Sequence, residues 1–381
     1  MGPVTDFPAA LRLPRTPALV VRRAALEANL SAMQAACDAA GVRLRPHGKM
    51  AKCSRLALRQ IELGAVGLCC QTVGEAEAYA AAGIGDLLLS APVPPWGWPV
   101  LAALAGKGVR VTAVVDSPAQ VALAPEGVEL IADVDGGQHR SGTSFAGAPA
   151  LVRAILGSGR RWAGIQCYLG HLQAYPDRAA AHAVAMGHIR SLIAELKMQG
   201  LKPAVITGGG TGTAALDLAS GVFTELQAGS YALMDAAYAM AGAAFEPALL
   251  LAATVVSVQH KSHITIDSGL KALSADGPPA RLVAGAPDGA LFRFQGDEHG
   301  ALVHPQFAAR LKAEGFGAVS ALDTDSDIAW PDWPAEGGLV WLQPGHVDPT
   351  VNLHDMLWVA DEDGGLEPWP IDARRTTPWP A

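Results

Sequence analysis

Through most of the first 245 residues, a short apolar run, a turn and a stretch with helical hydrophobic spacing recur in that order. The apolar runs have the length and continuity of strands buried on both faces. We expect strands at Val42–Pro46, Val66–Cys70, Asp86–Ser90, Val109–Asp116, Glu129–Asp135, Ala163–Tyr168, Ala204–Thr207 and Thr224–Gln227. Between and before them, we expect helices at Ala24–Ala40, Lys52–Leu63, Val73–Ala82, Val100–Lys107, Ala148–Leu156 and Asp177–Gln199.

Eight such strand–helix units predict an α/β fold, a parallel (β/α)₈ barrel of the TIM type. A doubly wound open sheet is the rival interpretation, because it also needs apolar strands covered by helices. The count of eight favours the barrel.

The pattern changes after about Phe245, where short alternating or β-branched runs are separated by Gly, Pro and Asp. This part predicts a second, mostly antiparallel β domain, with one helix near Pro305–Glu314. We assign residues 24–245 to the barrel, and residues 1–23 with 246–381 to the β domain. The strands expected in the β domain are Ala18–Arg22, Leu249–Val258, His263–Asp267, Ala290–Phe294, Leu339–Leu342 and Leu357–Val359.

Composition narrows the class of protein. Half of the 381 residues are hydrophobic, and the formal net charge is −8 with no basic block, which argues against global disorder and against a nucleic-acid partner. The five cysteines are an odd number and suit a reducing cytoplasm better than a disulfide framework. The most apolar stretch, 236–258, is interrupted by Glu246-Pro247, so we expect no membrane span.

The first candidate for chemistry is Lys49, in the run Arg45-Pro46-His47-Gly48-Lys49 after the first barrel strand. Barrel active sites lie at the carboxyl ends of the strands. A lysine amine held there among apolar walls can form a Schiff base with an aldehyde. A solvated loop lysine is the alternative interpretation, and the commoner one for a lone lysine.

The second candidate is the glycine-rich run Thr207-Gly208-Gly209-Gly210-Thr211-Gly212-Thr213 after the seventh strand. Its glycines would let backbone N–H groups approach an anion, and barrels often bind phosphate after strands seven and eight. A second turn, within Glu225–Tyr231, follows the eighth strand and could close the same cup. A plain turn is the alternative interpretation.

The third candidate is the pair His346 and Asp348 in Gly345-His346-Val347-Asp348-Pro349-Thr350. Residues two apart in a strand face the same side, so the pair could hold one divalent cation. On spacing alone, a structural histidine beside a turn aspartate is the favoured interpretation.

A lysine with a phosphate cup suits pyridoxal 5′-phosphate (PLP). The chain resembles the fold-type III PLP enzymes with an alanine-racemase-like barrel and, within them, the D-threonine aldolase / D-serine dehydratase family. The matching runs keep the family's order over most of the chain. They are Arg45–Lys49, Gly67–Gln71 with Glu75-Ala-Glu77, Gly208–Gly212, Glu225–Tyr231 with Met234-Asp235, Asp267–Lys271, Asp297–Gly300 and Gly345–Thr350 with Asn352.

The resemblance implies a role for each matching position. Lys49 would bind PLP as a Schiff base, Arg140 would lie near the ring oxygen, and Tyr168 would meet the pyridine nitrogen. His346 and Asp348 would bind the metal and take part in catalysis with Lys49. The remaining implied cofactor contacts are His47, Gln71, Thr207, Gly209, Gly210, Thr211, Gly229, Ser230 and Tyr231.

Two positions depart from the family pattern. The family often has His-Gly after the tyrosine of strand six, whereas this chain has Leu169-Gly170-His171. The family also often has a histidine shortly after the cofactor lysine, where this chain has Ala51 before Lys52. Both departures bear on how the substrate is held.

The resemblance implies a lyase, a PLP- and metal-dependent aldolase that cleaves D-3-hydroxy amino acids to glycine and an aldehyde. D-Threonine, 3-hydroxy-D-aspartate and D-phenylserine are the candidate substrates. A dehydratase acting on D-serine or D-threo-3-hydroxyaspartate is the alternative. Two other functions of this fold type fit less well. Racemisation would give the metal pair no role. The PLP-binding proteins that act in cofactor homeostasis consist of a single barrel and lack the β domain that we expect here.

The residue at 348 discriminates between the two reactions. Family members with a cysteine there resemble zinc-using dehydratases, whereas an aspartate resembles the aldolases, since a thiolate favours Zn²⁺ and a carboxylate with an imidazole tolerates harder cations. Asp348 therefore favours the aldolase, with Mn²⁺ as the expected activator and Mg²⁺, Co²⁺ or Zn²⁺ as alternatives. The resemblance further implies a homodimer.

Overall fold

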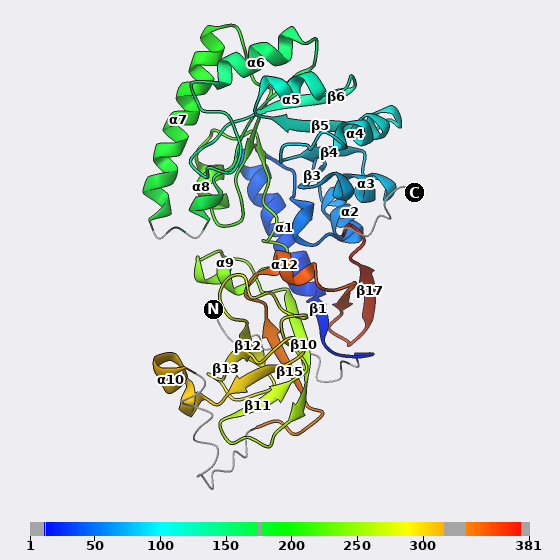
Figure 1. Ribbon diagram of the computed structural model, residues 1–381, viewed down its shortest axis with the longest axis vertical. Helices are drawn as coiled ribbons and strands as arrows, with labels where there is room; N and C mark the ends of the chain where they lie inside the picture. The colour runs from blue at the N-terminus through cyan, green and yellow to red at the C-terminus, as the bar shows by residue number, and fades with distance from the viewer. Residues whose placement is uncertain (1–10, 12, 174, 176, 316–332, 375–381) are drawn as a thin grey trace. The chain divides into compact units, whose positions relative to one another are not determined.

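The computed structural model describes residues 11, 13–173, 175, 177–315 and 333–374 (Figure 1). The chain forms two compact units. One contains the described residues of Met1–Ala28, with Leu233–Met240 and Phe245–Ile371; the other contains Asn29–Ala232, Ala241–Ala244 and the described residues of Asp372–Ala381. Parts of the expected β domain (1–10, 316–332 and 375–381) lie outside the described residues.

The second unit contains the predicted parallel barrel. Its sheet has the order β2-β9-β8-β7-β6-β5-β4-β3, and every neighbouring pair is parallel. A parallel bridge between His47 and Cys69 and a hydrogen bond from the Val66 N–H to the Leu44 carbonyl join the two ends of this order. The strands are β2 (Arg43–Leu44), β3 (Leu68–Cys70), β4 (Asp86–Leu89), β5 (Arg110–Val115), β6 (Val128–Asp133), β7 (Trp162–Cys167), β8 (Val205–Gly208) and β9 (Glu225–Leu226).

All eight predicted strands are present, and their sequential order excludes the doubly wound sheet. The helices between them include the six predicted ones and two short ones, α5 and α8, whose six residues are too few to show a helical period. The helices are α1 (Arg23–Ala40), α2 (Ser54–Glu62), α3 (Val73–Ala81), α4 (Gly97–Gly106), α5 (Pro118–Leu123), α6 (Ala148–Gly157), α7 (Arg178–Met198) and α8 (Ala214–Ala219).

Alternation along the strands divides the barrel core into two layers. Leu88, Val114 and Ile131 pack together as an inner cluster. Their sequence neighbours, such as Leu87, Leu89 and others on every long strand, pack outward in a cluster that includes residues of α3, α4, α6 and α7. Because both faces are buried, these strands read as continuous apolar runs, which is why the sequence predicts them well.

The first unit is a nine-stranded, mostly antiparallel sheet, as predicted. Its main path is β13-β14-β11-β10-β1-β16-β17, with β15 paired to β10 and β12, and its only parallel pairing among the described strands is β1 with β16. Its elements are β1 (Ala18–Arg22), α9 (Ala236–Met240), β10 (Leu249–Ser257), β11 (His263–Ile266), β12 (Arg281–Ala284), β13 (Leu291–Phe294), β14 (Gly300–Val303), α10 (Pro305–Glu314), β15 (Leu339–Gln343), α12 (Val347–Val351), β16 (Met356–Ala360) and β17 (Leu366–Pro370).

Three of these strands, β12, β14 and β17, were not predicted. β17 contains Pro368 and Pro370 and pairs only with β16, at the end of the sheet order, which is where a strand tolerates proline. Within the described residues, no helix is both long enough and apolar enough to cross a bilayer.

Candidate active site

Lys49 lies in a single 3₁₀ turn, η1 (Gly48–Met50), that follows β2. A Cβ atom at Gly48 would lie 2.7 Å from the Tyr79 ring and 2.8 Å from Leu68, so glycine is required there. The Tyr79 hydroxyl also donates a hydrogen bond of 2.8 Å to the Gly48 carbonyl oxygen. Packing from α3 and β3 therefore fixes the turn that carries Lys49 at the carboxyl end of a barrel strand.

His47 connects this turn to the neighbouring strands. Its Nδ1 accepts a hydrogen bond from the Lys49 backbone N–H at 3.4 Å, so Nε2 carries the proton of the neutral ring and donates to Ser90 Oγ at 3.0 Å. The Ser90 hydroxyl donates in turn to the Cys70 carbonyl at 3.2 Å. Burial, reinforced by the charge of Lys49, lowers the pKa of His47 well below its ordinary value, although a hydrogen bond with Gln71 opposes the shift. His47 is therefore neutral.

Lys52, the second lysine of the same segment, has a different environment. Its ammonium lies 2.6 Å from Glu75 Oε1, and this carboxylate is almost fully buried. The other oxygen of Glu75 accepts a hydrogen bond of 2.7 Å from the Gln71 backbone N–H. Lys52 is thus part of a buried ion pair that holds the loop after β3.

Tyr168 and Arg140 come from two neighbouring loops at the same ends of the strands. Tyr168 follows β7, and Arg140 lies in the loop after β6 with its guanidinium carbon 5.6 Å from the centre of the Tyr168 ring. This is a cation–π contact. The imidazole of His171 packs against Gly137 of the β6 loop, 3.2 Å from the position that a Cβ would take.

The two positions that depart from the family pattern are buried. Leu169 is 0% exposed and belongs to the outward core of the barrel, and Ala51 is 3% exposed. Both side chains therefore serve packing in this chain.

The glycine-rich run after β8 and the turn after β9 supply buried backbone donors. Among the described residues, no group accepts a hydrogen bond from the N–H groups of Gly210, Thr211 and Gly229, although all three residues are buried. Buried N–H groups without an acceptor are rare in native proteins. Three of them after adjacent strands fit the terminal phosphate of PLP, whose oxygens are acceptors.

The other predicted contacts of this cup hold it together from within. The Tyr231 N–H donates to Thr211 Oγ1 at 2.9 Å, and the Tyr231 hydroxyl accepts from Gln60 Nε2 at 2.9 Å. Burial raises the pKa of the Tyr231 phenol. Thr207 is fully buried and accepts from Gln227 Nε2 at 2.9 Å, and Ser230 is 6% exposed.

Packing behind the loop gives a second reason for the glycines. A Cβ at Gly209 would lie 2.6 Å from Asp217 Oδ2, and a Cβ at Gly210 would lie 2.7 Å from Gln173 Oε1. Protein atoms behind the loop exclude side chains at these positions. From the sequence, we expected the glycines only to give an anion room to approach. Gly209 also has φ +76°, which favours glycine.

Asp133, the last residue of β6, is a buried acid that the sequence did not single out. Its carboxylate accepts hydrogen bonds from Gln166 Nε2 at 2.9 Å and from the Ser141 hydroxyl at 2.9 Å. Burial raises the pKa of Asp133 to about 6, against the effect of these two hydrogen bonds. Gln166 also accepts from Gln227 Nε2 at 3.0 Å, so a polar network links β6, β7 and β9.

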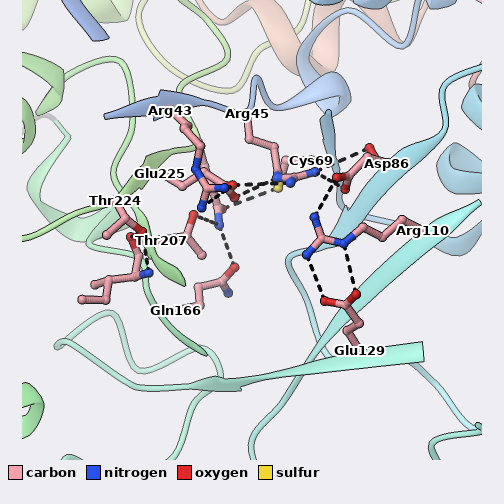
Figure 2. Close-up of polar contacts among 12 residues, drawn as sticks. Arg43, Arg45, Cys69, Asp86, Arg110, Glu129, Gln166, Thr207, Thr224 and Glu225 are labelled. Carbon is pink, nitrogen blue, oxygen red and sulfur yellow. Dashed lines mark hydrogen bonds and ion pairs between the residues drawn. The ribbon is translucent and has the colours of Figure 1, made fainter. Parts of the chain in front are cut away.

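At the other ends of the strands, a belt of ion pairs closes the barrel (Figure 2). Arg45 lies 2.7 Å from both Glu225 and Asp86, and Arg110 bridges Asp86 and Glu129 at 3.1 and 3.0 Å. Asp86, Arg110 and Glu225 are the first residues of β4, β5 and β9. Arg45 therefore links β2, which precedes the turn with Lys49, to β9, which precedes the turn with Gly229.

The predicted metal pair lies in the other unit, and its local structure corrects the sequence argument. His346 is the N-cap of the short helix α12, and Asp348 lies in its first turn, so the two do not share a strand face. Pro349 suits a helical first turn, which explains the difference. His346 Nδ1 instead lies 2.8 Å from Asp276 Oδ2.

Buried Asp235 lies close to both members of the pair. Its carboxylate accepts a hydrogen bond of 2.9 Å from the Val347 N–H. Burial raises its pKa, although hydrogen bonds from the backbone N–H groups of Tyr238 and Val347 oppose the shift. The described residues contain no group of three or more His, Cys, Asp or Glu side chains placed to hold a metal, so a cation here would need water or substrate oxygens as well.

Two family models match the chain: the alanine racemase N-terminal domain over residues 21–237 and the putative serine dehydratase domain over residues 248–360. The chain is 40% identical to a D-threonine aldolase of an Arthrobacter species over 94% of this chain and 92% of the relative. The chain belongs to the D-threonine aldolase / D-serine dehydratase family of fold-type III PLP enzymes.

Two further members of the family match over almost their whole lengths. The crystal structure of a D-threonine aldolase from Filomicrobium marinum superposes with a TM-score of 0.84 at 34% identity, covering 97% of this chain and 99% of that one. A D-threo-3-hydroxyaspartate dehydratase of a Delftia species is 30% identical over 93% of this chain and 96% of the relative. The family thus contains both reactions that the sequence left open.

Several residues around the family's motifs were missed from the sequence. Gln173, Asp133 and Asp276 act through partners on other elements, at sequence separations of 33 to 70 residues. No local pattern marks such partners. A weak signal existed only for Thr213, because threonine is a preferred residue at the N-cap of a helix, the position that it takes before α8.

Proposed function

We propose that this protein is a PLP- and divalent-metal-dependent aldolase that cleaves D-3-hydroxy amino acids to glycine and an aldehyde. The observation that carries the proposal concerns the N–H groups of the buried residues Gly210, Thr211 and Gly229, which have no acceptor among the described residues. They offer an anion cup at the strand ends where Lys49 also lies. Family membership and the D-threonine aldolase relatives support the reaction.

Within this proposal, each residue of the barrel mouth has a task. Lys49 binds the cofactor aldehyde, and neutral His47 holds the Lys49 backbone through Nδ1. The cup N–H groups would hold the phosphate, and Tyr168, in cation–π contact with Arg140, would face the cofactor ring. Bound PLP supplies an electron sink for the charge left on Cα when the Cα–Cβ bond breaks.

Lys49 is a better candidate than Lys52 for this covalent role. The Lys52 ammonium is engaged by the buried Glu75 carboxylate at 2.6 Å and is not available to attack a carbonyl. Breaking that pair would also leave the Glu75 charge buried without its partner, which is costly.

We propose His346 and Asp348 as ligands of the divalent metal. The donor chemistry fits, because Asp276 accepts from Nδ1–H of His346 and leaves Nε2 of the neutral ring with its lone pair for a cation, a common arrangement around metal-binding histidines. An imidazole with a carboxylate tolerates Mn²⁺, Mg²⁺ and Co²⁺ as well as Zn²⁺, and we propose Mn²⁺ as the activator. A bound divalent cation supplies a Lewis acid that acidifies a hydroxyl group.

Removal of the metal tests this assignment. We expect EDTA to reduce aldol cleavage of D-threonine by at least about a hundredfold, and Mn²⁺ to restore it, because a Lewis acid contributes several kcal/mol. The yellow colour of bound PLP should persist in EDTA. Asp348→Ala should lose activity likewise, whereas Asp288→Asn, at an exposed loop acid, should not. Full activity in EDTA would contradict the proposed metal dependence.

The dehydratase stays as a second candidate, because a dehydratase relative matches the chain over 93% of its length. Pyruvate from D-serine formed faster than glycine from D-threonine would favour it.

We also propose that the protein is a cytoplasmic homodimer. All five cysteines are free and buried, which suits a reducing compartment. The dimer rests on the family resemblance, and light scattering tests it directly: a monomeric mass at working concentration would contradict it.

A further inference from the structure

A group of buried polar side chains lies behind the glycine-rich loop. They have no role in the proposed reaction, and the sequence assigned none of them a function. We call Gln173, Thr213, Asp217 and His182 the support network. Their exposed fractions are 8%, 1%, 1% and 4%. They come from the loop after β7, from the start and middle of α8, and from α7.

The hydrogen bonds of the support network converge on the Asp217 carboxylate. Gln173 Nε2 donates to Thr213 Oγ1 at 3.1 Å, and the Thr213 hydroxyl donates to Asp217 Oδ2 at 2.6 Å. The other oxygen of Asp217 lies 2.7 Å from His182 Nε2. The Thr213 hydroxyl accepts from one neighbour and donates to the next, so its loss would remove a hydrogen bond from each. Gln173 Nε2 would keep the longer bond to the Leu169 carbonyl at 3.4 Å, and Asp217 would keep His182.

The support network touches the backbone of the cup at three residues, Gly209, Gly210 and Gly212. Gln173 Oε1 accepts a hydrogen bond of 2.8 Å from the Gly212 N–H. The same oxygen packs against Gly210, and Asp217 Oδ2 packs against Gly209, so closely that a Cβ atom would meet them at 2.7 and 2.6 Å. The direction in which the Gly210 and Thr211 N–H groups point therefore depends on the support network.

A buried ionic network is costly unless every member is satisfied, and it rarely improves on apolar packing for stability alone. Here it lies directly behind the loop in which the N–H groups of Gly210 and Thr211 have no acceptor among the described residues. We propose that Gln173, Thr213, Asp217 and His182 are positioning residues that hold the cup in shape for the phosphate of the cofactor. This inference rests on the proposed function, since it takes PLP as the ligand of the cup.

The test compares Thr213→Val with Thr213→Ser in the full-length apoprotein, titrated with PLP and separately with pyridoxal, which lacks the phosphate. Valine keeps the shape of threonine but removes the hydroxyl. We expect Thr213→Val to weaken PLP binding by about five- to hundredfold, the range for leaving buried polar groups unpaired. Pyridoxal binding should change less than about twofold, and Thr213→Ser should bind PLP within about threefold of the unaltered protein, since it keeps the relay.

Ile189→Val is the control, because Ile189 is a fully buried residue of α7 outside the support network. It should lower thermal stability without changing the preference for PLP over pyridoxal. If Thr213→Val fails to fold, Gln173→Met gives the same test, because it removes the bond to Gly212 and keeps the packing volume.

Unchanged PLP affinity in Thr213→Val, or an equal loss for PLP and pyridoxal, would overturn the inference while leaving the proposed function in place. Failure of the unaltered apoprotein to bind PLP at all would overturn both.

Discussion

At the scale of single residues, the surroundings of chemically similar groups decide their roles. Lys49 and Lys52 are three positions apart, and Lys52 is paired with the buried Glu75. The Lys49 motif was recognisable from the sequence, because its residues are contiguous. The pairing of Lys52 was not, because Glu75 is 23 residues away on α3.

We therefore expect borohydride to fix PLP covalently on Lys49. Peptide mapping by mass spectrometry after reduction should place the label on the peptide with Lys49, and Lys49→Ala should lose it. Lys52→Met should keep the label but lose stability, since it leaves Glu75 buried without its cation. A label on Lys52 would contradict the assignment.

Asp133 gives a prediction for stability against pH. Its pKa is raised to about 6 in the folded protein, so between about pH 4 and 6 the folded state keeps a proton that the unfolded chain has lost. Stability should therefore fall as pH rises through this window and stay lower above it. Asparagine at this position has no charge, so Asp133→Asn should not lose stability in this window. The free energy of unfolding of the variant minus that of the unaltered protein should therefore be about 2–3 kcal/mol larger at about pH 7 than at about pH 4.

Urea unfolding of the two proteins across this range measures the difference. Asp288→Asn, at an exposed position, should show no such trend. A difference between Asp133→Asn and the unaltered protein that does not change with pH would contradict the raised pKa.

At the scale of elements, patterns that are local in sequence were predictable and patterns that depend on pairing were not. The eight parallel strands are buried on both faces, so they read as apolar runs and were predicted. β17 was not, because it contains prolines. From the sequence, the single turn of α12 reads as part of a strand. The belt of ion pairs also escaped prediction. Arg45 follows β2, whereas Asp86 and Glu225 begin β4 and β9, so the three meet only when the barrel closes.

We expect Arg45→Met to lower the free energy of unfolding by about 3–5 kcal/mol, because it leaves the buried Glu225 carboxylate without its close cation. The double variant Arg45→Met/Glu225→Met should recover much of this loss, since the unpaired charge is gone. Arg161→Ala, at the exposed end of the belt beside Glu129, should cost less than about 1 kcal/mol. Equal effects of Arg45→Met and Arg161→Ala in denaturant titrations would contradict this role for the belt.

At the scale of the whole molecule, the chain combines a parallel barrel with a mostly antiparallel sheet unit, and the family models match these parts in turn. This architecture could be predicted, because each part has its own hydrophobic period. The choice between aldol cleavage and dehydration could not be derived from the fold, because relatives of both kinds share it. It rests on Asp348, a single residue whose ligand chemistry differs from that of a cysteine.

The product balance from D-threonine tests this choice most directly. With PLP and Mn²⁺ present, the purified protein should convert D-threonine to glycine and acetaldehyde in equal amounts, measured together by chromatography after derivatisation, and should leave L-threonine unchanged. Release of ammonia with 2-oxobutanoate in place of glycine would contradict the aldolase and establish the dehydratase.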